Sequence, residues 1–546
     1  MESPNQNSVL KNLLGLALLT ILAFLIMGYH PGLEDDAFYL AAIKRNLNPN
    51  LFPHDADFFR VQFQATIFDK LVAWSVRLSH IPLAWAALFW QLGAIFLVLH
   101  GCWRIARRCF LDPAAQWSAV SLVSVLLTLP VSGTGITLAD QYLHPRTLAT
   151  AAILAAIVAV IDRRFWIAAL LLAVAFAIHA IMASFGISFC AFLAWTLHSG
   201  YVRSRTARPI AAVMLLPMGA FAFVNGHFRG PFSWIFEPSS DAWRRAAATR
   251  SFYFLTRWEW YEWLGIFAPL VLLVSLRYFG WSKFLPRYAT SNSGIPRRSN
   301  SADHNSTALV PLLSSLIYYG VFQTVVGLLV MLPPSLERLR PFEPMRYLHL
   351  LYLLMFLTFG GLIGGWVARK MSQSTTPFFR QPMIPVLLFF VPVAAGMSYA
   401  QLQMFPATSH LELPGVASSN AWVQAFGWIR QNTPVDSLFA LDPHYVELPG
   451  EDYHGFRALA ERSALADYVK DGGMAARVPQ LAPRWIKEVE AQSGWPNFQA
   501  ADFARLKKEF GVNWVIVSDS AAAQRLESMG ITCIYQNSRV KVCRLQ

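Results

Sequence analysis

The chain has 546 residues, of which 55% are hydrophobic and only 14% are charged, and its mean hydropathy is +0.39. This balance excludes an ordinary soluble globular protein and indicates a polytopic membrane protein. The formal net charge of +13 is what cytoplasmic Lys and Arg and contacts with anionic headgroups give a membrane protein, so we predict no nucleic-acid partner.

The first apolar run extends from Leu13 to Gly28 and is followed by an acidic stretch without a small-residue cleavage pattern. We therefore expect a retained membrane helix and not a cleaved signal peptide. Further runs of about 20 apolar residues raise the predicted number of transmembrane helices to eleven. The other ten cover 81–101, 114–131, 147–162, 165–180, 182–199, 209–226, 262–279, 309–332, 347–367 and 382–400.

Short basic clusters predict the orientation of these helices. All the clusters fall on one side of the membrane if the N-terminus is cytoplasmic, as the positive-inside rule requires. They are Arg104, Arg107 and Arg108; Arg163 and Arg164; Arg203, Arg205 and Arg208; Lys283, Arg287, Arg297 and Arg298; and Arg369, Lys370 and Arg380. The first loop (30–80), the loops 227–261 and 333–346, and the tail from 401 are then extracytoplasmic.

The first loop opens with GLEDDAFYLAAIKRNL (32–47), and a second acidic motif, HDAD, occupies 54–57. Asp35 and Asp36 can be acids of a helix first turn, which stabilise its N-terminus, but this does not explain their place at the mouth of a membrane helix. Because neighbours on a helix point about 100° apart, the two cannot share one small centre equally. For HDAD a turn after Pro53 is favoured over a zinc site.

Two further polar segments are predicted at the same membrane face, DQYLHPR (140–146) and ERLRPFEPMR (337–346). Their arginines, Arg146, Arg338, Arg340 and Arg346, lie on the side where the topology signal disfavours arginine, so they need another reason to be there. Arginine forks bind an anionic phosphate, and a carboxylate can take a proton or hold a divalent metal. Binding of lipid headgroups is the alternative for the arginines, and an interfacial cap is the alternative for His144 and Arg146.

From about Gln401 the composition becomes that of a soluble domain, so we predict a membrane domain over 1–400 and an α/β domain over 401–546. Its predicted elements are helices at 419–432, 478–492 and 500–510, strands at 437–442 and 513–519, and a hairpin at 531–543. Cys533 and Cys543 lie at near-symmetric positions about the turn of that hairpin. A cross-strand disulfide and two buried thiols are both compatible with this spacing.

The first loop and the tail resemble the GT-C superfamily, membrane glycosyltransferases that use polyprenyl-linked sugars, such as protein O-mannosyltransferases, aminoarabinose transferases and oligosaccharyltransferase catalytic subunits. The similar segments are the Asp35-Asp36 pair with Phe38-Tyr39 and LAAIKRNL (40–47), and in the tail WIRQNTPVDSLFALDP (428–443), FRALAERS (456–463) and GVNWVIVSD (511–519). A WWDYG-like signature and a mannosyltransferase acceptor motif are both missing, so the donor sugar and the acceptor stay open.

This resemblance implies a fold and a set of roles. The fold is an all-α membrane domain with a C-terminal extracytoplasmic α/β domain, in the inner membrane of a bacterium, with the tail in the periplasm. Asp35 would be the general base or the ligand of a divalent metal, Mg or Mn, supported by Asp36. The remaining residues would bind the polyprenyl-phosphate sugar: Tyr39, His144, Arg146, Arg338, Arg340 and Arg346, of which Arg346 lies closest to the start of its span. The acceptor would be a glycan, a lipid or a protein.

Two other classes remain as alternatives, a multi-pass transporter or lipid flippase and a non-catalytic scaffold. Transporter folds commonly contain an internal repeat and polar groups near the bilayer midplane. The two halves of this chain are not similar, and its charges cluster at the ends of the spans, which favours an enzyme. Replacement of Asp35 separates enzyme from scaffold, because a scaffold keeps its function after Asp35→Asn.

Overall fold

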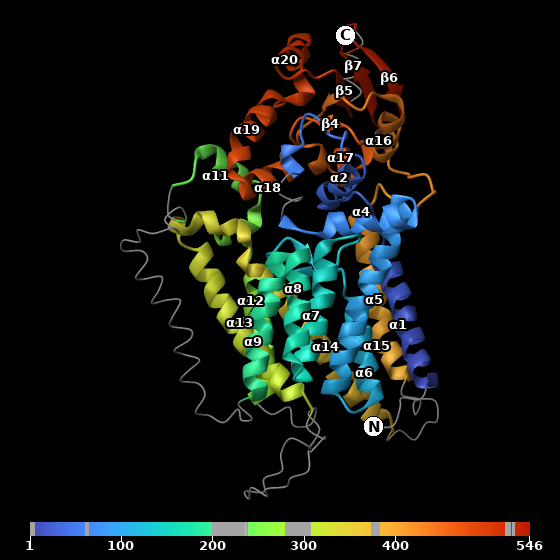
Figure 1. The fold of residues 1–546 in the computed structure, drawn as a ribbon, viewed down its shortest axis with the longest axis vertical. Coiled ribbons are helices and arrows are strands. Elements are labelled where there is room, and N and C mark those ends of the chain that lie inside the picture. The colour runs from blue at the N-terminus through green and yellow to red at the C-terminus, as the bar shows by residue number, and fades with distance from the viewer. Residues whose placement is uncertain are drawn as a thin grey trace, which may run out of the picture.

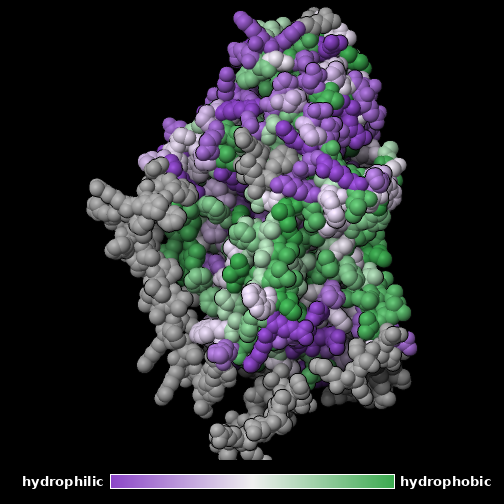
Figure 2. Space-filling model, viewed as in Figure 1, coloured by the Kyte–Doolittle hydropathy of each residue, from purple (hydrophilic) through white to green (hydrophobic). Residues whose placement is uncertain are grey.

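The computed structural model describes residues 6–59, 65–198, 235, 238–278, 307–372, 383–518, 526 and 530–545. A bundle of helices forms one half of the molecule and a smaller domain with a β-sheet lies over one end of it (Figure 1). The bundle carries a hydrophobic belt between two hydrophilic zones (Figure 2). This distribution of side chains is that of a protein which crosses a lipid bilayer.

The helices of the bundle follow the apolar runs of the sequence. They are α1 (Gln6–Met27), α5 (Leu83–Cys109), α6 (Pro113–Val125), α7 (Pro145–Ile161), α8 (Phe165–Ile178), α9 (Ala180–His198), α12 (Trp260–Tyr278), α13 (Leu309–Met331), α14 (Leu348–Ser372) and α15 (Met383–Met404). In the described part of the chain, six helices are long and apolar enough to cross a membrane: α1, α5, α9, α12, α13 and the run Pro344–Lys370. The predicted span 209–226 lies outside the described residues, and the total of eleven stays a prediction.

The span predicted at 114–131 ends early. Asp112 caps the start of α6 by accepting a hydrogen bond from the Ala114 N–H, at 2.9 Å, and the helix stops at Val125. The chain then forms a small antiparallel hairpin of β1 (Pro130–Val131) and β2 (Ile136–Thr137). Pro130 has no backbone N–H and so cannot donate the hydrogen bond that would continue a helix. The glycine-rich turn that follows favours the reversal of the chain between β1 and β2.

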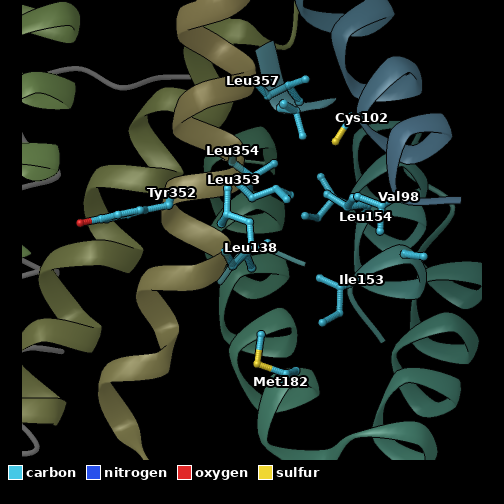
Figure 3. Packing of buried hydrophobic residues seen from close by; sticks show 14 of the residues in the cluster. Val98, Cys102, Leu138, Ile153, Leu154, Met182, Tyr352, Leu353, Leu354 and Leu357 are labelled. Carbon is cyan, nitrogen blue, oxygen red and sulfur yellow. The ribbon is translucent and has the colours of Figure 1, made fainter. Parts of the chain in front are cut away.

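Buried side chains of α5, α7 and α14 belong to one large hydrophobic core in the bundle. Leu353 and Leu354 of α14 point toward Leu154 of α7 and Val98 of α5, while Tyr352 points to the opposite side (Figure 3). The Tyr352 hydroxyl donates a hydrogen bond to the Gly265 carbonyl of α12, at 2.7 Å. One helix, α14, therefore joins two parts of the bundle.

The described basic clusters gather at the end of the bundle that lies away from the sheet domain. Arg108 at the end of α5 donates from Nε to Asp162 at the end of α7, at 2.6 Å, and the Arg108 carbonyl accepts from the Ala308 N–H before α13. Arg277 near the end of α12 donates to Ser314 of α13, at 3.2 Å. The side of the membrane on which this end lies stays a prediction, and the clusters at 203–208, 283–298 and Arg380 lie outside the described residues.

The C-terminal domain contains a five-stranded sheet with the order β4-β3-β5-β7-β6. Its strands are β3 (Leu438–Ala440), β4 (Ser463–Ala464), β5 (Trp514–Val517), β6 (Thr532–Gln536) and β7 (Lys541–Arg544). The strand β3 pairs in parallel with β4 and β5, and β7 pairs antiparallel with β5 and β6. A disulfide joins Cys533 of β6 to Cys543 of β7.

The described part of this domain contains five α-helices, of which those at 421–432, 482–491 and 500–510 match predicted helices. The five are α16 (Ala421–Asn432), α17 (Phe456–Ala460), α18 (Lys470–Arg477), α19 (Ala482–Ala491) and α20 (Ala500–Phe510). The capping residue of α16 is Asn420, whose side chain accepts from the Trp422 and Val423 N–H groups, and α20 ends at Gly511 in the left-handed conformation. Both are frequent signals for the start and the end of a helix.

The first loop is part of the same layer as the C-terminal domain. It contains α2 (Asp36–Leu47) and α4 (Phe68–Ser79), and a third short helix, α11 (Asp241–Ala248), comes from the later loop. Phe58 and Phe59 of the first loop share a hydrophobic core with Trp243 of α11 and Trp485 of α19. The tail thus builds one of its hydrophobic cores together with both loops, and the domain boundary at residue 400 stays a prediction.

Candidate functional site

A cavity of about 910 Å³ lies between the helical bundle and the C-terminal domain. Its walls come from the start of α2, the β1–β2 hairpin, the segments 140–146 and 250–253, α12, α14 and α18. The sequence predicts that Asp35, His144 and Arg346 converge on one cavity. Asp35 and Arg346 do line it, and His144 lies just behind the wall.

Asp35 is the residue immediately before α2, and its side chain keeps 31% of its accessible surface. The Asp35 N–H donates to the Tyr142 hydroxyl, at 3.3 Å, and the Asp35 Oδ1 atom lies 3.4 Å from the Lys470 Nζ atom of α18. Burial by itself raises the pKa of Asp35, but the charges of Lys470 and Arg250 outweigh it and hold that pKa well below its usual range. Asp35 is therefore ionised at neutral pH and can accept a hydrogen bond from a nucleophile.

Asp36 points away from this cavity. Its Oδ2 atom accepts from the Gly32 N–H, at 2.6 Å, and the residue lines a second cavity of about 600 Å³ on the other side of α2. Burial raises the pKa of Asp36 to about 7, against the opposing effects of the Gly32 hydrogen bond and of Lys44. Neighbouring side chains on a helix point in different directions, and this separates the two acids. In this geometry the Asp36 side chain therefore does not give Asp35 the support that the sequence predicts.

Three more of the predicted residues form a buried group around the start of α7. The Asp140 carboxylate accepts two hydrogen bonds from Arg146 Nη2, at 2.5 and 2.6 Å. The His144 ring lies 4.7 Å from the Tyr39 ring, and its Nδ1 atom caps α7 by accepting from the Arg146 N–H, at 2.9 Å. Tyr39 and Arg146 line the cavity, and the Nε and Nη1 atoms of Arg146 are buried without a partner among the described residues. Arg146 can thus offer donors to an anion.

Arg346 reaches the cavity from the short 3₁₀ turn η7 (Pro344–Tyr347) at the start of the α14 run. Its Nη1 atom lies 2.6 Å from the Glu343 Oε2 atom, and Arg477 of α18 lies 3.0 Å from the other oxygen of Glu343. Glu343 has a positive φ of 54°, a conformation that is uncommon for a residue other than glycine. One buried carboxylate therefore holds two arginines from distant segments beside the same cavity.

Arg338 and Arg340 do not line the cavity. Arg338 donates to the Pro238 carbonyl, at 3.0 Å, and the Arg340 guanidinium lies 5.0 Å from the centre of the Phe254 ring. Both belong to the 3₁₀ segment η6 (Pro334–Phe342), which Glu343 separates from η7. The turn at Glu343 directs this segment away from Arg346, so their predicted role in phosphate binding is not supported by their position.

The cavity also contains three cations that the sequence did not single out, Arg250, Lys470 and Arg477. Arg250 follows α11, and the other two lie on α18. Lys470 forms an ion pair with Glu34 and approaches Asp35, whereas Arg250 has no hydrogen bond or ion pair from its side chain within the described ranges. The only signal for α18 in the sequence is the pattern KDGGMAAR, with basic residues seven positions apart.

The divalent metal predicted at Asp35 stays a prediction. In the part of the chain that the structure describes, no group of three or more His, Cys, Asp or Glu residues is arranged to hold a metal ion. The Lys470 ammonium occupies the approach to Asp35, at 3.4 Å. A cation in this place supplies the charge that a metal would otherwise bring.

The wall of the cavity toward the bundle is apolar. Leu264, Ala268 and Leu272 lie one turn apart on α12 and line the cavity, as do Met355 and Phe356 of α14. Leu264 and Leu272 also keep 54% and 47% of their surface accessible. The apolar end of the cavity therefore lies against α12 and α14 of the bundle, and its charged end lies against the C-terminal domain.

No protein-family model and no curated protein matches the sequence. Among solved structures, the chain is similar to the crystal structure of the Archaeoglobus fulgidus oligosaccharyltransferase in the apo form. The TM-score is 0.45 and the identity 12%, and the match covers 93% of this chain and 69% of the archaeal chain. The case for a function therefore depends on the cavity.

Proposed function

We propose that the protein is a membrane glycosyltransferase of the GT-C kind, which transfers a sugar from a polyprenyl-phosphate donor to an acceptor at the face of the C-terminal domain. The observation that carries this proposal is the composition of one cavity. An ionised carboxylate, Asp35, faces several cations at its polar end, and apolar residues of the membrane helices α12 and α14 form the wall of its other end. A lipid-linked phosphosugar has the same order of polar and apolar parts.

The polar end supplies the groups that a glycosyl transfer needs. A nucleophilic group of the acceptor attacks the anomeric carbon, and the bond from that carbon to the phosphate oxygen breaks with its electron pair leaving on the phosphate. Arg146, Arg250 and Arg346 would stabilise this charge through forked hydrogen bonds. The acceptor's proton would pass to Asp35, which is ionised and lies at the same end of the cavity.

The apolar end would hold the first part of the prenyl chain. The α12 residues that line it are spaced four apart, which places them in one row along the helix. A prenyl chain in this row would lie against Leu264, Ala268 and Leu272, of which the two leucines keep about half of their surface accessible. The positive-inside bias supports the proposal that this end of the protein lies outside the cytoplasm, as in a bacterial inner-membrane enzyme with a periplasmic domain.

Thermal unfolding of the purified full chain with a panel of polyprenyl-phosphate sugars tests the proposal. A donor at a hundred times its dissociation constant should stabilise the protein by about 2.7 kcal/mol. The Asp35→Asn variant should keep this stabilisation, because the carboxylate acts on the acceptor, whereas Arg250→Ala should reduce it. If no donor shifts the unfolding transition, the proposal fails and a transporter or a scaffold becomes the better description.

A further inference from the structure

One face of α18 closes the polar end of the cavity. Lys470, Gly473, Met474 and Arg477 all line it, at positions i, i+3, i+4 and i+7 of the helix. These positions lie on one side of a helix. The basic residues thus stand at the two ends of this face, and a glycine lies between them.

The glycines of α18 are in close contact with the segment that follows α11. A Cβ atom built on Gly473 would lie 2.3 Å from Arg250 Nη2 and 2.4 Å from Arg250 Nε. A Cβ atom on Gly472 would lie 2.9 Å from Thr249 Oγ1 and 3.1 Å from the Trp485 ring. The Arg250 guanidinium therefore packs against the backbone of α18 at Gly473. It occupies the space that the side chain of any other residue at position 473 would fill.

A glycine inside a helix has a cost of its own, since alanine is the better helix former. Gly473 needs a reason other than helix stability, and the position of the Arg250 guanidinium supplies one. Arg250 is also distinct from Arg146, Arg346, Lys470 and Arg477, which all pair with carboxylates. No such partner is present for Arg250 among the residues that the structure describes, so its donors remain available to a ligand.

We infer that Gly473 is a positioning residue: the absence of its side chain lets the Arg250 guanidinium lie across α18, between Lys470 and Arg477, where it binds the phosphate of the donor. This inference rests on the proposed function for the identity of the ligand. The placement of Arg250 by Gly473 does not depend on it. A methyl group at 473 would displace the guanidinium toward solvent, because the end of an arginine side chain moves more easily than a helix backbone.

The test compares Gly473→Ala with Gly427→Ala in the full chain. Gly427 lies in α16 and a Cβ atom built there meets nothing within 4 Å, which makes it a matched helical glycine. The probes are geranylgeranyl monophosphate and the neutral alcohol geranylgeraniol, presented in the same detergent. Gly473→Ala should weaken binding of the phosphate by about ten- to a hundredfold, as expected for a lost charge-assisted hydrogen bond. The same substitution should lower neither the affinity for the alcohol nor the melting temperature. Gly427→Ala should leave the affinities for the phosphate and for the alcohol unchanged.

A double-mutant cycle separates positioning from a merely structural effect. In an Arg250→Ala background, Gly473→Ala should have no further effect on affinity for the phosphate, because the group that it displaces is already absent. If the two losses add instead, Gly473 does not act through Arg250 and the inference is overturned. Equal weakening of phosphate and alcohol by Gly473→Ala would overturn it as well.

A measurement without any ligand keeps this inference distinguishable from the proposed function. The rate at which phenylglyoxal modifies Arg250, followed by peptide mass spectrometry, should rise in Gly473→Ala and stay unchanged in Gly427→Ala. An unchanged rate in Gly473→Ala would overturn the positioning role, whatever the protein binds. If the rate rises but the wild-type protein prefers no phosphate probe over the alcohol, the positioning role stands and the glycosyltransferase proposal fails.

Discussion

At the scale of single residues, Asp35 and Asp36 are adjacent in sequence but belong to different cavities. Asp35 lines the charged cavity, and Asp36 is buried on the opposite side of α2 with a backbone hydrogen bond from Gly32. The pKa of Asp35 is held low by neighbouring cations, whereas burial raises that of Asp36 to about 7. Substitutions of the two acids should therefore have different consequences.

We predict that Asp35→Asn lowers turnover at least a hundredfold, the lower end of what a general base contributes. The side chain is nearly isosteric, so the melting temperature and the affinity for the donor should stay close to those of the wild type. Turnover is measured with the donor found in the binding panel, beside Asp36→Asn as the neighbouring control. Full activity of Asp35→Asn would contradict its catalytic role.

Asp36 should make the stability of the protein depend on pH. Because its pKa is raised to about 7 in the folded state, the folded protein keeps a proton that the unfolded chain loses near pH 4. The stabilising contribution of this group is complete below about pH 4 and is lost as the pH rises through about 7. Asp36→Asn should therefore flatten the fall in melting temperature between about pH 5 and pH 8. Asp35→Asn should leave that slope unchanged, since the pKa of Asp35 lies below this range.

At the scale of elements, α12 has one face toward the cavity and another toward the outside. Ala268 lines the apolar end of the cavity, and Val271, which keeps 63% of its surface exposed, does not line it. Ala268→Trp should weaken binding of long-chain prenyl donors by about tenfold or more, since each methylene that loses its burial costs about 0.8 kcal/mol. Donors with a short chain should be affected less, and Val271→Trp should change neither. Equal effects of the two substitutions would place the prenyl chain elsewhere.

The disulfide hairpin is an element whose loss should change stability but not catalysis. The strand β6 lies at the edge of the sheet, and the bridge closes a loop with a sequence separation of 10. The chain-entropy model gives roughly 3 kcal/mol for a loop of this length. The Cys533→Ser and Cys543→Ser double variant should unfold at a lower temperature while its turnover at low temperature equals that of the wild type. A loss of turnover without a loss of stability would indicate a role for this hairpin near the cavity.

At the scale of the whole molecule, the charges of the bundle predict its orientation. The basic ends of α5 and α12 lie away from the C-terminal domain, so the positive-inside rule places that domain outside the cytoplasm. A reporter that is active only outside the cytoplasm should therefore work when fused after Gln546. The same orientation predicts that Cys533 and Cys543 are oxidised in intact cells, because disulfides persist outside the cytosol. A reporter that works only in the cytoplasm would reverse the predicted topology.

Local patterns in the sequence were sufficient for the class of the protein and for most of its helices and strands. Apolar runs predict α1, α5 and α7, and the residues around Cys533 and Cys543 predict the hairpin, because both depend on neighbours along the chain. Asp35 and Arg346 could be placed at the cavity for a similar reason. Each is a charged residue at the mouth of a membrane helix, and Arg346 also opposes the topology signal.

The tertiary structure alone decided which charges share the cavity. Arg338 and Arg346 are eight positions apart, yet the turn at Glu343 sends only Arg346 to the site. Arg250 and Lys470 come from segments 220 positions apart and meet because α11 packs against α18 across two glycines. No periodicity encodes such a contact, since it depends on which faces of two distant helices bury each other. The sequence by itself therefore determined a membrane protein with an acidic loop at its surface, and the packing of that loop with the tail determined the site.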